Sequence, residues 1–161
     1  MAPIHAIQLT PMITRALEED WGFGDWTTDI CVAASTQAKA RIIAKEPTVA
    51  AGVEVAEAVF KLVDPSLKVE VKASNGDQLS RGDLIVEITG SARSILKAER
   101  VALNFLGRMC GIAALTRQFV KELAGTKVQL LDTRKTTPGM RLLEKSATVI
   151  GGARNHRMCL T

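Results

Sequence analysis

Apolar residues recur at every third or fourth position in several stretches of the chain, which is typical of amphipathic helices. The spacing predicts helices over residues 7–21, 53–63 and 94–124. A shorter helix is predicted to start at Pro138, since Thr137 can cap it and proline suits a first helical position. Gly125 follows the longest stretch and predicts its carboxyl end.

Shorter runs of alternating or continuous apolar residues predict strands between these helices. The expected strands cover residues 38–44, 67–71 and 84–88, with a short apolar piece at 47–52 and glycine turns at 75–77 and 80–83. Two more short strands are expected at 128–131, as a buried strand, and at 147–150. The first group predicts an antiparallel sheet with helices packed on it.

The longest predicted helix carries two distinct faces. Its apolar stripe consists of Ile95, Ala98, Ala102, Phe105, Met109 and Ile112, and its other face gathers Arg100, Asn104, Gly107, Arg108 and Gly111. Each glycine inside a helix costs roughly 1 kcal/mol relative to alanine. Either the backbone packs closely there beside a polar site, or the helix breaks near Gly107 or Gly111.

The loop after residues 128–131 has the composition of an anion-binding site. It runs from Asp132 to Gly139 and contains three threonines with Arg134 and Lys135 between them. A guanidinium can grip a carboxylate or phosphate with two hydrogen bonds, and an ammonium adds a compact positive charge.

A second cationic loop is expected beside the first. Residues 128–131, the short helix and residues 147–150 read as a strand, a helix and a parallel strand, and residues 151–157 follow at once. The carboxyl ends of neighbouring parallel strands lie at one rim, where α/β proteins place their chemistry. The loop of Arg134 and the loop of Arg157 should therefore share that rim.

Composition narrows the classes of partner. The formal charge is +4 and the pI about 9.1, but aromatic residues make up only 4% and no basic run exceeds two residues, which argues against nucleic acid. The chain contains no apolar run long enough to cross a membrane and no secretory signal pattern. Three separated cysteines argue against a disulfide framework or a zinc site and for a reducing, cytoplasmic compartment.

Several motifs resemble the quinolinate phosphoribosyltransferase family, also called nicotinate-nucleotide pyrophosphorylase (carboxylating). They are Gly24–Thr28, Ala98–Leu106, Gly111–Ala113, Asp132–Gly139, Glu144–Lys145, Gly151–Gly152 and Asn155–Arg157, in this order along the chain. The resemblance covers almost the whole chain but only the earlier part of the family.

The resemblance implies transfer of a ribosyl phosphate from phosphoribosyl pyrophosphate to quinolinate, with loss of pyrophosphate and carbon dioxide to give nicotinate mononucleotide. It implies a homodimer in which Arg100 reaches the partner's site, and Mg²⁺ as cofactor with ligands beyond residue 161. The expected substrate-binding residues are Arg100, Thr133, Arg134, Lys135, His156 and Arg157, with Lys135 also catalytic. Glu144 and Lys145 are expected to support the rim, and Asp25, Thr27 and Thr28 to form a capping loop.

The predicted fold class is α/β: an α+β sandwich domain over residues 1–101, followed over 102–161 by the first part of an incomplete α/β barrel. We expect such a chain to be a fragment that is inactive alone, because a closed barrel takes about 200 residues or more. Two other interpretations stay open: a related phosphoribosyltransferase acting on another acid, and a non-catalytic dimerisation or regulatory module.

Overall fold

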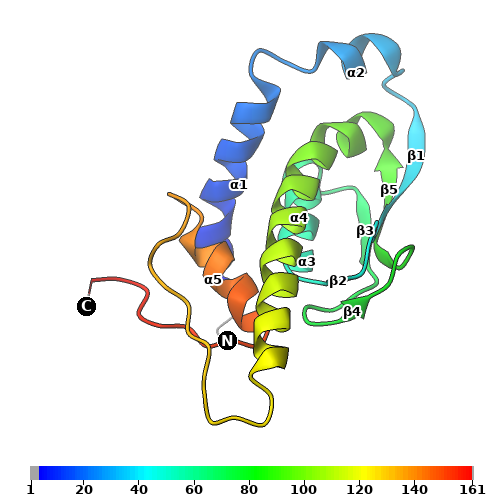
Figure 1. The fold of residues 1–161 in the computed structure, drawn as a ribbon. Helices are drawn as coiled ribbons and strands as arrows, with labels where there is room; N and C mark the ends of the chain where they lie inside the picture. Colours follow the sequence, from blue (N-terminus) through cyan, green and yellow to red (C-terminus); the bar gives the residue numbers. More distant parts are fainter. Residues whose placement is uncertain (1–3, 161) are drawn as a thin grey trace.

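The computed structural model describes residues 4–160, which form five helices and five strands in that range (Figure 1). In chain order they are α1 (Ala6–Trp21), α2 (Trp26–Cys31), β1 (Gln37–Ile43), β2 (Thr48–Val49), α3 (Val53–Val63), β3 (Lys68–Val71), β4 (Gln78–Leu79), β5 (Leu84–Ser91), α4 (Ala92–Glu122) and α5 (Arg141–Ile150). The antiparallel sheet is confirmed, with strand order β1-β5-β3 and a separate β2-β4 pair.

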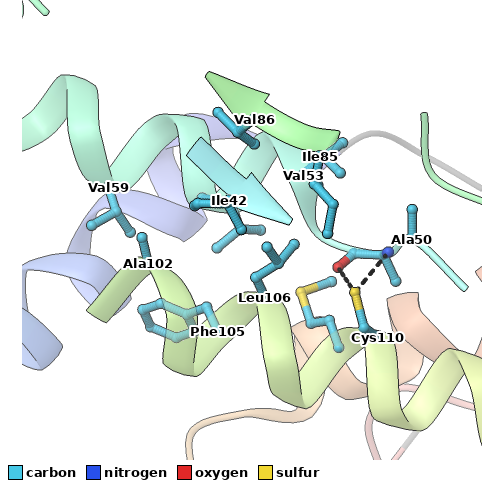
Figure 2. Packing of buried hydrophobic residues seen from close by; sticks show 14 of the residues in the cluster. Ile42, Ala50, Val53, Val59, Ile85, Val86, Ala102, Phe105, Leu106 and Cys110 are labelled. Carbon is cyan, nitrogen blue, oxygen red and sulfur yellow. Dashed lines mark hydrogen bonds between the residues drawn. The ribbon is translucent and has the colours of Figure 1, made fainter. Parts of the chain in front are cut away.

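Helix α4 is the central element of the fold. Figure 1 shows it between the sheet and α3 on one side and α1 and α5 on the other. Its predicted apolar stripe is confirmed, because Ala98 and Ala102 are fully buried and Met109 is 1% exposed. Leu106 and Phe105 lie among Val59, Ile42 and Val86 in Figure 2, so helices and sheet share one core.

The start of α3 comes unusually close to α4. Gly52 has a φ of 82°, a conformation that favours glycine, and a Cβ built there would lie 2.4 Å from the sulfur of Met109. The neighbouring Cys110 thiol accepts a hydrogen bond from the Ala51 amide at 3.4 Å (Figure 2). These contacts anchor the turn between β2 and α3 on the helix.

Helix α4 runs unbroken through both of its glycines, so the predicted break is wrong. The predicted close packing at these glycines is also wrong within this chain, since a Cβ at Gly107 or Gly111 would meet nothing within 4 Å. The domain division expected between residues 101 and 102 falls inside α4 and stays a prediction.

The amino-terminal loop contains a short helix that the sequence did not reveal. Asp25 caps α2 by accepting a hydrogen bond from the Thr28 amide at 3.0 Å, as expected for a capping loop. The hydroxyl and amide of Thr28 together hold the pKa of Asp25 below its ordinary value. On α4, Arg93 and Lys97 both lie within 4 Å of Asp29 and so tie α2 to the rest of the fold.

The C-terminal region differs most from prediction. Residues 147–150 belong to α5 and not to a strand, and α5 begins at Arg141 because Gly139 has a φ of 79°, outside helical geometry. Residues 128–131 are not a buried strand: Val128 is 62% exposed, and only Leu131 pairs, in a parallel bridge with Arg154. The strand–helix–strand unit therefore closes at Arg154, a few residues later than predicted.

Candidate anion-binding site

The two cationic loops leave the same end of one parallel backbone pairing. Beside the Leu131–Arg154 bridge, the Asp132 amide donates to the Arg154 carbonyl at 3.1 Å, and the Arg154 amide donates to the Leu130 carbonyl at 2.9 Å. Parallel segments continue in the same direction, so residues 132–139 and 155–157 emerge side by side. The predicted common rim is present in the backbone.

A buried ion pair joins the two loops to α5. Lys145 Nζ lies 2.5 Å from Asp132 Oδ1 and also donates to the carbonyls of His156 (3.1 Å) and Arg157 (3.2 Å). The side chain of Lys145 is 1% exposed and that of Asp132 is 6% exposed. We call this contact the Asp132–Lys145 pair.

Asp132 receives further donors from the second loop. The His156 amide donates to Asp132 Oδ1 at 2.7 Å. With its amide turned to satisfy both partners, Asn155 donates to Asp132 Oδ2 at 2.5 Å and to the Lys145 carbonyl at 3.0 Å. One carboxylate therefore fixes the start of the first loop against the backbone and a side chain of the second.

The far end of the first loop is held by a second polar group on α5. Glu144 accepts from Arg108 Nε at 2.8 Å and from the Thr137 amide at 3.1 Å, while Arg108 also donates to the Thr137 hydroxyl at 2.6 Å. Burial would raise the pKa of Glu144, but the hydrogen bonds from Arg108 and Thr137 outweigh it and hold the pKa below its ordinary value. Glu144 and Lys145 thus support the rim, as predicted.

The predicted binding side chains on the loops are mostly free to meet a ligand. Thr133, Lys135, His156 and Arg157 are exposed, and Arg134 is partly buried. Among residues 4–160, Arg134 Nε is buried and has no hydrogen-bond partner. A buried donor without an acceptor is costly, so a bound anion would complete it.

Local contacts fix the conformation of these loops. The Thr133 hydroxyl accepts from the Lys135 amide at 3.0 Å, and His156 Nδ1 accepts from the Arg157 amide at 2.8 Å. The Arg157 guanidinium reaches the Leu160 carbonyl at 3.3 Å. The roles assigned to these residues stay predictions, since their contacts are within the protein.

Arg100 is the predicted site residue that lies on α4 and not on one of the two loops. It is exposed on α4, and within the described part of the chain it forms no hydrogen bond or ion pair with either loop. Asn104 and Arg108, one and two turns further along α4, instead line a cavity of about 660 Å³ between α1, α4 and residues 138–140. The binding role expected for Arg100 therefore stays a prediction.

Sequence reasoning missed three of the residues that hold the site together. Asp132 and Asn155 stood in the recognised motifs, and Arg108 stood on the polar face of α4, but none was assigned a supporting role. The available signal was a single acidic residue between an apolar run and two cations. Because its carboxylate is negatively charged, Asp132 would repel an anion, which indicates that it pairs with a cationic side chain elsewhere in the chain.

Neither a metal site nor a membrane segment is found in the part of the chain that was described. Across residues 4–160, no three histidine, cysteine or acidic side chains are grouped to hold a metal ion. The helices in that range include none long and apolar enough to cross a membrane. Mg²⁺ thus stays a prediction, because the donor groups described do not form a site for it.

The fold and the rim define a class: an α+β layer joined to a strand–helix–strand unit whose two loops carry exposed cations. Residues 25–110 match the domain family described as "Quinolinate phosphoribosyl transferase, N-terminal domain", and residues 112–161 match its "C-terminal domain". The chain therefore belongs to the quinolinate phosphoribosyltransferase family.

Individual relatives agree with this assignment. The chain is 42% identical over 154 residues to a "Probable nicotinate-nucleotide pyrophosphorylase [carboxylating]" of Synechocystis, covering 96% of this chain and 52% of that protein. It is 44% identical over 160 residues to "Quinolinate phosphoribosyltransferase [decarboxylating] 1" of Nicotiana glauca, covering 98% and 45%. The crystal structure of NadC from Streptococcus pyogenes superposes with a TM-score of 0.96 at 40% identity, covering 100% and 57%. The chain thus spans about half the length of the curated relatives it matches.

Proposed function

We propose that this chain supplies the quinolinate-binding rim of an enzyme that transfers ribosyl phosphate from phosphoribosyl pyrophosphate to quinolinate with decarboxylation. The products would be nicotinate mononucleotide, pyrophosphate and carbon dioxide, a step of NAD biosynthesis. The observation that supports this best is the pairing of Leu131 with Arg154, which brings Arg134, Lys135, His156 and Arg157 to one rim.

The chemistry of the rim suits a ligand with two adjacent carboxylates. Arg134 and Arg157 lie on different loops, so each can bind one carboxylate with a charge-assisted hydrogen bond. Thr133 and His156 add donors beside them. Binding of both carboxylates would orient the ring nitrogen towards the ribose carbon, so the contribution of these residues is positioning.

Lys135 is proposed to stabilise negative charge as pyrophosphate departs. Decarboxylation then follows at the carboxylate next to the ring nitrogen, because the positively charged nitrogen stabilises the electron pair that stays on the ring carbon when the bond to carbon dioxide breaks. This step needs no general base. The ring carbon then takes a proton from water to give nicotinate mononucleotide. Mg²⁺ is proposed as the cofactor because the family resemblance implies it, and it would share the stabilisation of the leaving pyrophosphate.

Replacement of Arg134 by alanine tests the proposal directly. A charge-assisted hydrogen bond contributes about 1.5–3 kcal/mol, so Arg134→Ala should weaken quinolinate binding roughly tenfold to a hundredfold in calorimetric titration. The matched control is Arg41→Ala, an exposed arginine on β1. Equal affinities of the native chain and Arg134→Ala would contradict the assignment.

We further propose that the 161-residue chain binds quinolinate but does not turn it over alone. The rim is proposed to bind the acid substrate, while across residues 4–160 no three histidine, cysteine or acidic side chains are grouped to hold Mg²⁺. A steady-state assay of the purified chain that yields nicotinate mononucleotide would contradict this. Binding of a different pyridine acid in preference to quinolinate would instead favour a related phosphoribosyltransferase.

A homodimer in which Arg100 completes the partner's rim is proposed from the family resemblance and from the exposure of Arg100, which forms no hydrogen bond or ion pair with either loop in the described part of the chain. Mixing Arg100→Ala with Arg134→Ala chains tests it, since a mixed dimer would hold one intact rim. Quinolinate binding should return to about a quarter of the sites. If the mixture of the two variants binds no better than either variant alone, the rims are formed within single chains. Tight self-association of the native chain without binding of any acid would favour a non-catalytic module.

A cytoplasmic location is proposed from the cysteines, which are all free: Cys31 and Cys159 are exposed and Cys110 is buried. Fractionation of cells expressing the tagged chain would test it. Enrichment with a membrane or organelle fraction would count against it.

A further inference from the structure

The two cationic loops of the rim lie on either side of α5 in the sequence and share little backbone pairing. Their bridge consists of Leu131 and Arg154 with two flanking hydrogen bonds. So short a pairing leaves the loops beyond it free to change their separation. The contacts that span this gap past the bridge come from the Asp132–Lys145 pair, from Asn155 and from Arg141. Arg141 donates to the Thr136 hydroxyl and to the Met158 carbonyl, both at 3.2 Å, and lies nearer the surface than the buried pair.

The N–H donors of Lys145 and both carboxylate oxygens of Asp132 are engaged in hydrogen bonds within the protein. An ammonium has three N–H donors, and Lys145 directs them to Asp132 Oδ1 and to the carbonyls of His156 and Arg157. Asp132 accepts from Lys145, His156 and Asn155. Because both side chains are buried, neither is available to a ligand, and their effect on binding has to act through the loops.

The attachment point of the pair is rigid. Lys145 lies in α5, which packs on α4: a Cβ at Gly151, just past the end of α5, would lie 2.5 Å from the Thr116 Cβ. The Arg117 guanidinium of α4 also donates to the carbonyls of Gly151 (3.1 Å) and Ile150 (3.2 Å). The pair therefore connects both loops to a helix that is held firmly on the core of the protein.

Resting on the function proposed above, we propose that the Asp132–Lys145 pair determines specificity: it sets the distance between the Arg134 and Arg157 loops so that the rim prefers a pyridine with two adjacent carboxylates over one with a single carboxylate. Asp132 and Lys145 are positioning residues in this account. A ligand that spans both loops gains from a fixed separation, since the loops need no ordering on binding. The affinity for a ligand held by one loop depends little on the separation of the two loops.

The test compares quinolinate with nicotinate, which carries only one carboxylate on the same ring. The variant is Asp132→Asn with Lys145→Met, which removes both charges and so leaves no buried charge without a partner. Calorimetric titration should show quinolinate affinity at least tenfold lower and nicotinate affinity changed by less than threefold. The control is Lys39→Met with Glu87→Gln, which removes an ion pair of 2.7 Å between β1 and β5, and it should leave both affinities unchanged.

The ratio of the two affinities separates positioning from general damage. Equal loss of quinolinate and nicotinate binding, or an unchanged ratio, would overturn the proposal while the proposed function stands. A native chain that binds neither acid would overturn both. If the double variant does not fold, Asp132→Glu serves instead: it keeps the charge but lengthens the side chain, so it should also lower the ratio, and an unchanged ratio in that variant would equally overturn the proposal.

Discussion

The sheet–helix layer, residues 37–122, and the C-terminal region, residues 123–160, are held together by different kinds of contact. In the first, the largest fully buried side chains are apolar, such as Phe60, Ile88 and Met109. In the second, the buried residues of α5 include Glu144, Lys145 and Ser146, and the preceding segment 124–129 is exposed. The first region is held by apolar packing, whereas the second adds buried charged and polar side chains to the apolar contacts of Leu143 and Ala147.

The two kinds of contact have different effects on the free energy of unfolding and on the geometry of the rim. Burial of apolar area stabilises a fold without regard to direction, whereas a buried ion pair adds little net stability but is satisfied in only a narrow range of positions. The layer should therefore set the free energy of unfolding, and the C-terminal region should set the geometry of the rim. The variants below test this division, from the largest effect to the smallest.

Phe60→Ala should have the largest effect on stability. Phe60 is 1% exposed on α3, and a buried phenylalanine reduced to alanine loses about 3–5 kcal/mol through lost burial and the cavity left behind. Urea denaturation monitored by circular dichroism measures the loss. Leu62→Ala is the control on the same helix, since Leu62 is 42% exposed, and a similar cost for both would break the assignment of stability to the core.

Gly151→Ala should act on the C-terminal region. The new Cβ would lie 2.5 Å from the Thr116 Cβ and 2.6 Å from the Ala113 carbonyl oxygen of α4, and such overpacking costs typically about 1–3 kcal/mol. Because the backbone oxygen cannot move aside easily, we expect α5 to shift away from α4. Amide hydrogen exchange should quicken in α5 and the rim while β5 keeps its protection; uniform quickening would show that the two regions unfold as one.

Acid should weaken the C-terminal region through Glu144. The lowered pKa of Glu144 means that its stabilisation is fully present above the ordinary value of 4.5 and is lost as the pH falls through the lowered value. Asp25 and Asp64 also have lowered pKa values because of hydrogen bonds from Thr28 and from Ser66, so the difference between the native chain and Glu144→Gln isolates Glu144. In urea denaturation between about pH 3 and 7, Glu144→Gln should be less stable than the native chain at pH 7. The difference in stability should shrink towards pH 3, because protonation of Glu144 in the native chain removes the charge that the substitution also removes.

Salt distinguishes this effect from that of an exposed pair on the sheet. Lys68 and Lys72 lower the pKa of Glu70 to about 2, but all three side chains are at least one-third exposed. Salt of about 1 M should therefore suppress the contribution of Glu70 and leave that of Glu144 largely in place. Equal salt sensitivity of Glu70→Gln and Glu144→Gln would contradict the burial of the Glu144 contacts.

The sequence predicted the layer well because its signals are local. The helix over residues 53–63 and the apolar stripe of α4 follow from spacing alone, and both are confirmed. The strand pair β2-β4 was not foreseen as a pair, because two-residue strands leave almost no pattern. The helix break at Gly107 or Gly111 was wrong because tertiary packing of the stripe overrides the modest cost of two glycines.

The C-terminal region was predicted less well because its structure depends on distant contacts. Residues 147–150 contain adjacent β-branched residues, which favour a strand locally, but packing on α4 keeps them helical. The side-by-side placement of the loops followed from the topology, whereas the link between Asp132 and Lys145 joins residues 13 positions apart and has no local signal. Side-chain identity pointed to the anion site and to Lys145 as a support of the rim, whereas only the fold showed that Asp132 is the partner of Lys145.

Gly111→Ala should produce the smallest change, and in the opposite direction to the others. A Cβ at Gly111 would meet nothing within 4 Å, so alanine should stabilise α4 by about 0.5–1 kcal/mol in the isolated chain. Denaturation at low and high protein concentration sharpens the result. A gain at low concentration that turns into a loss at high concentration would mean that a second copy packs closely on this face of α4. A loss at every concentration would contradict the open surface in the fold described above.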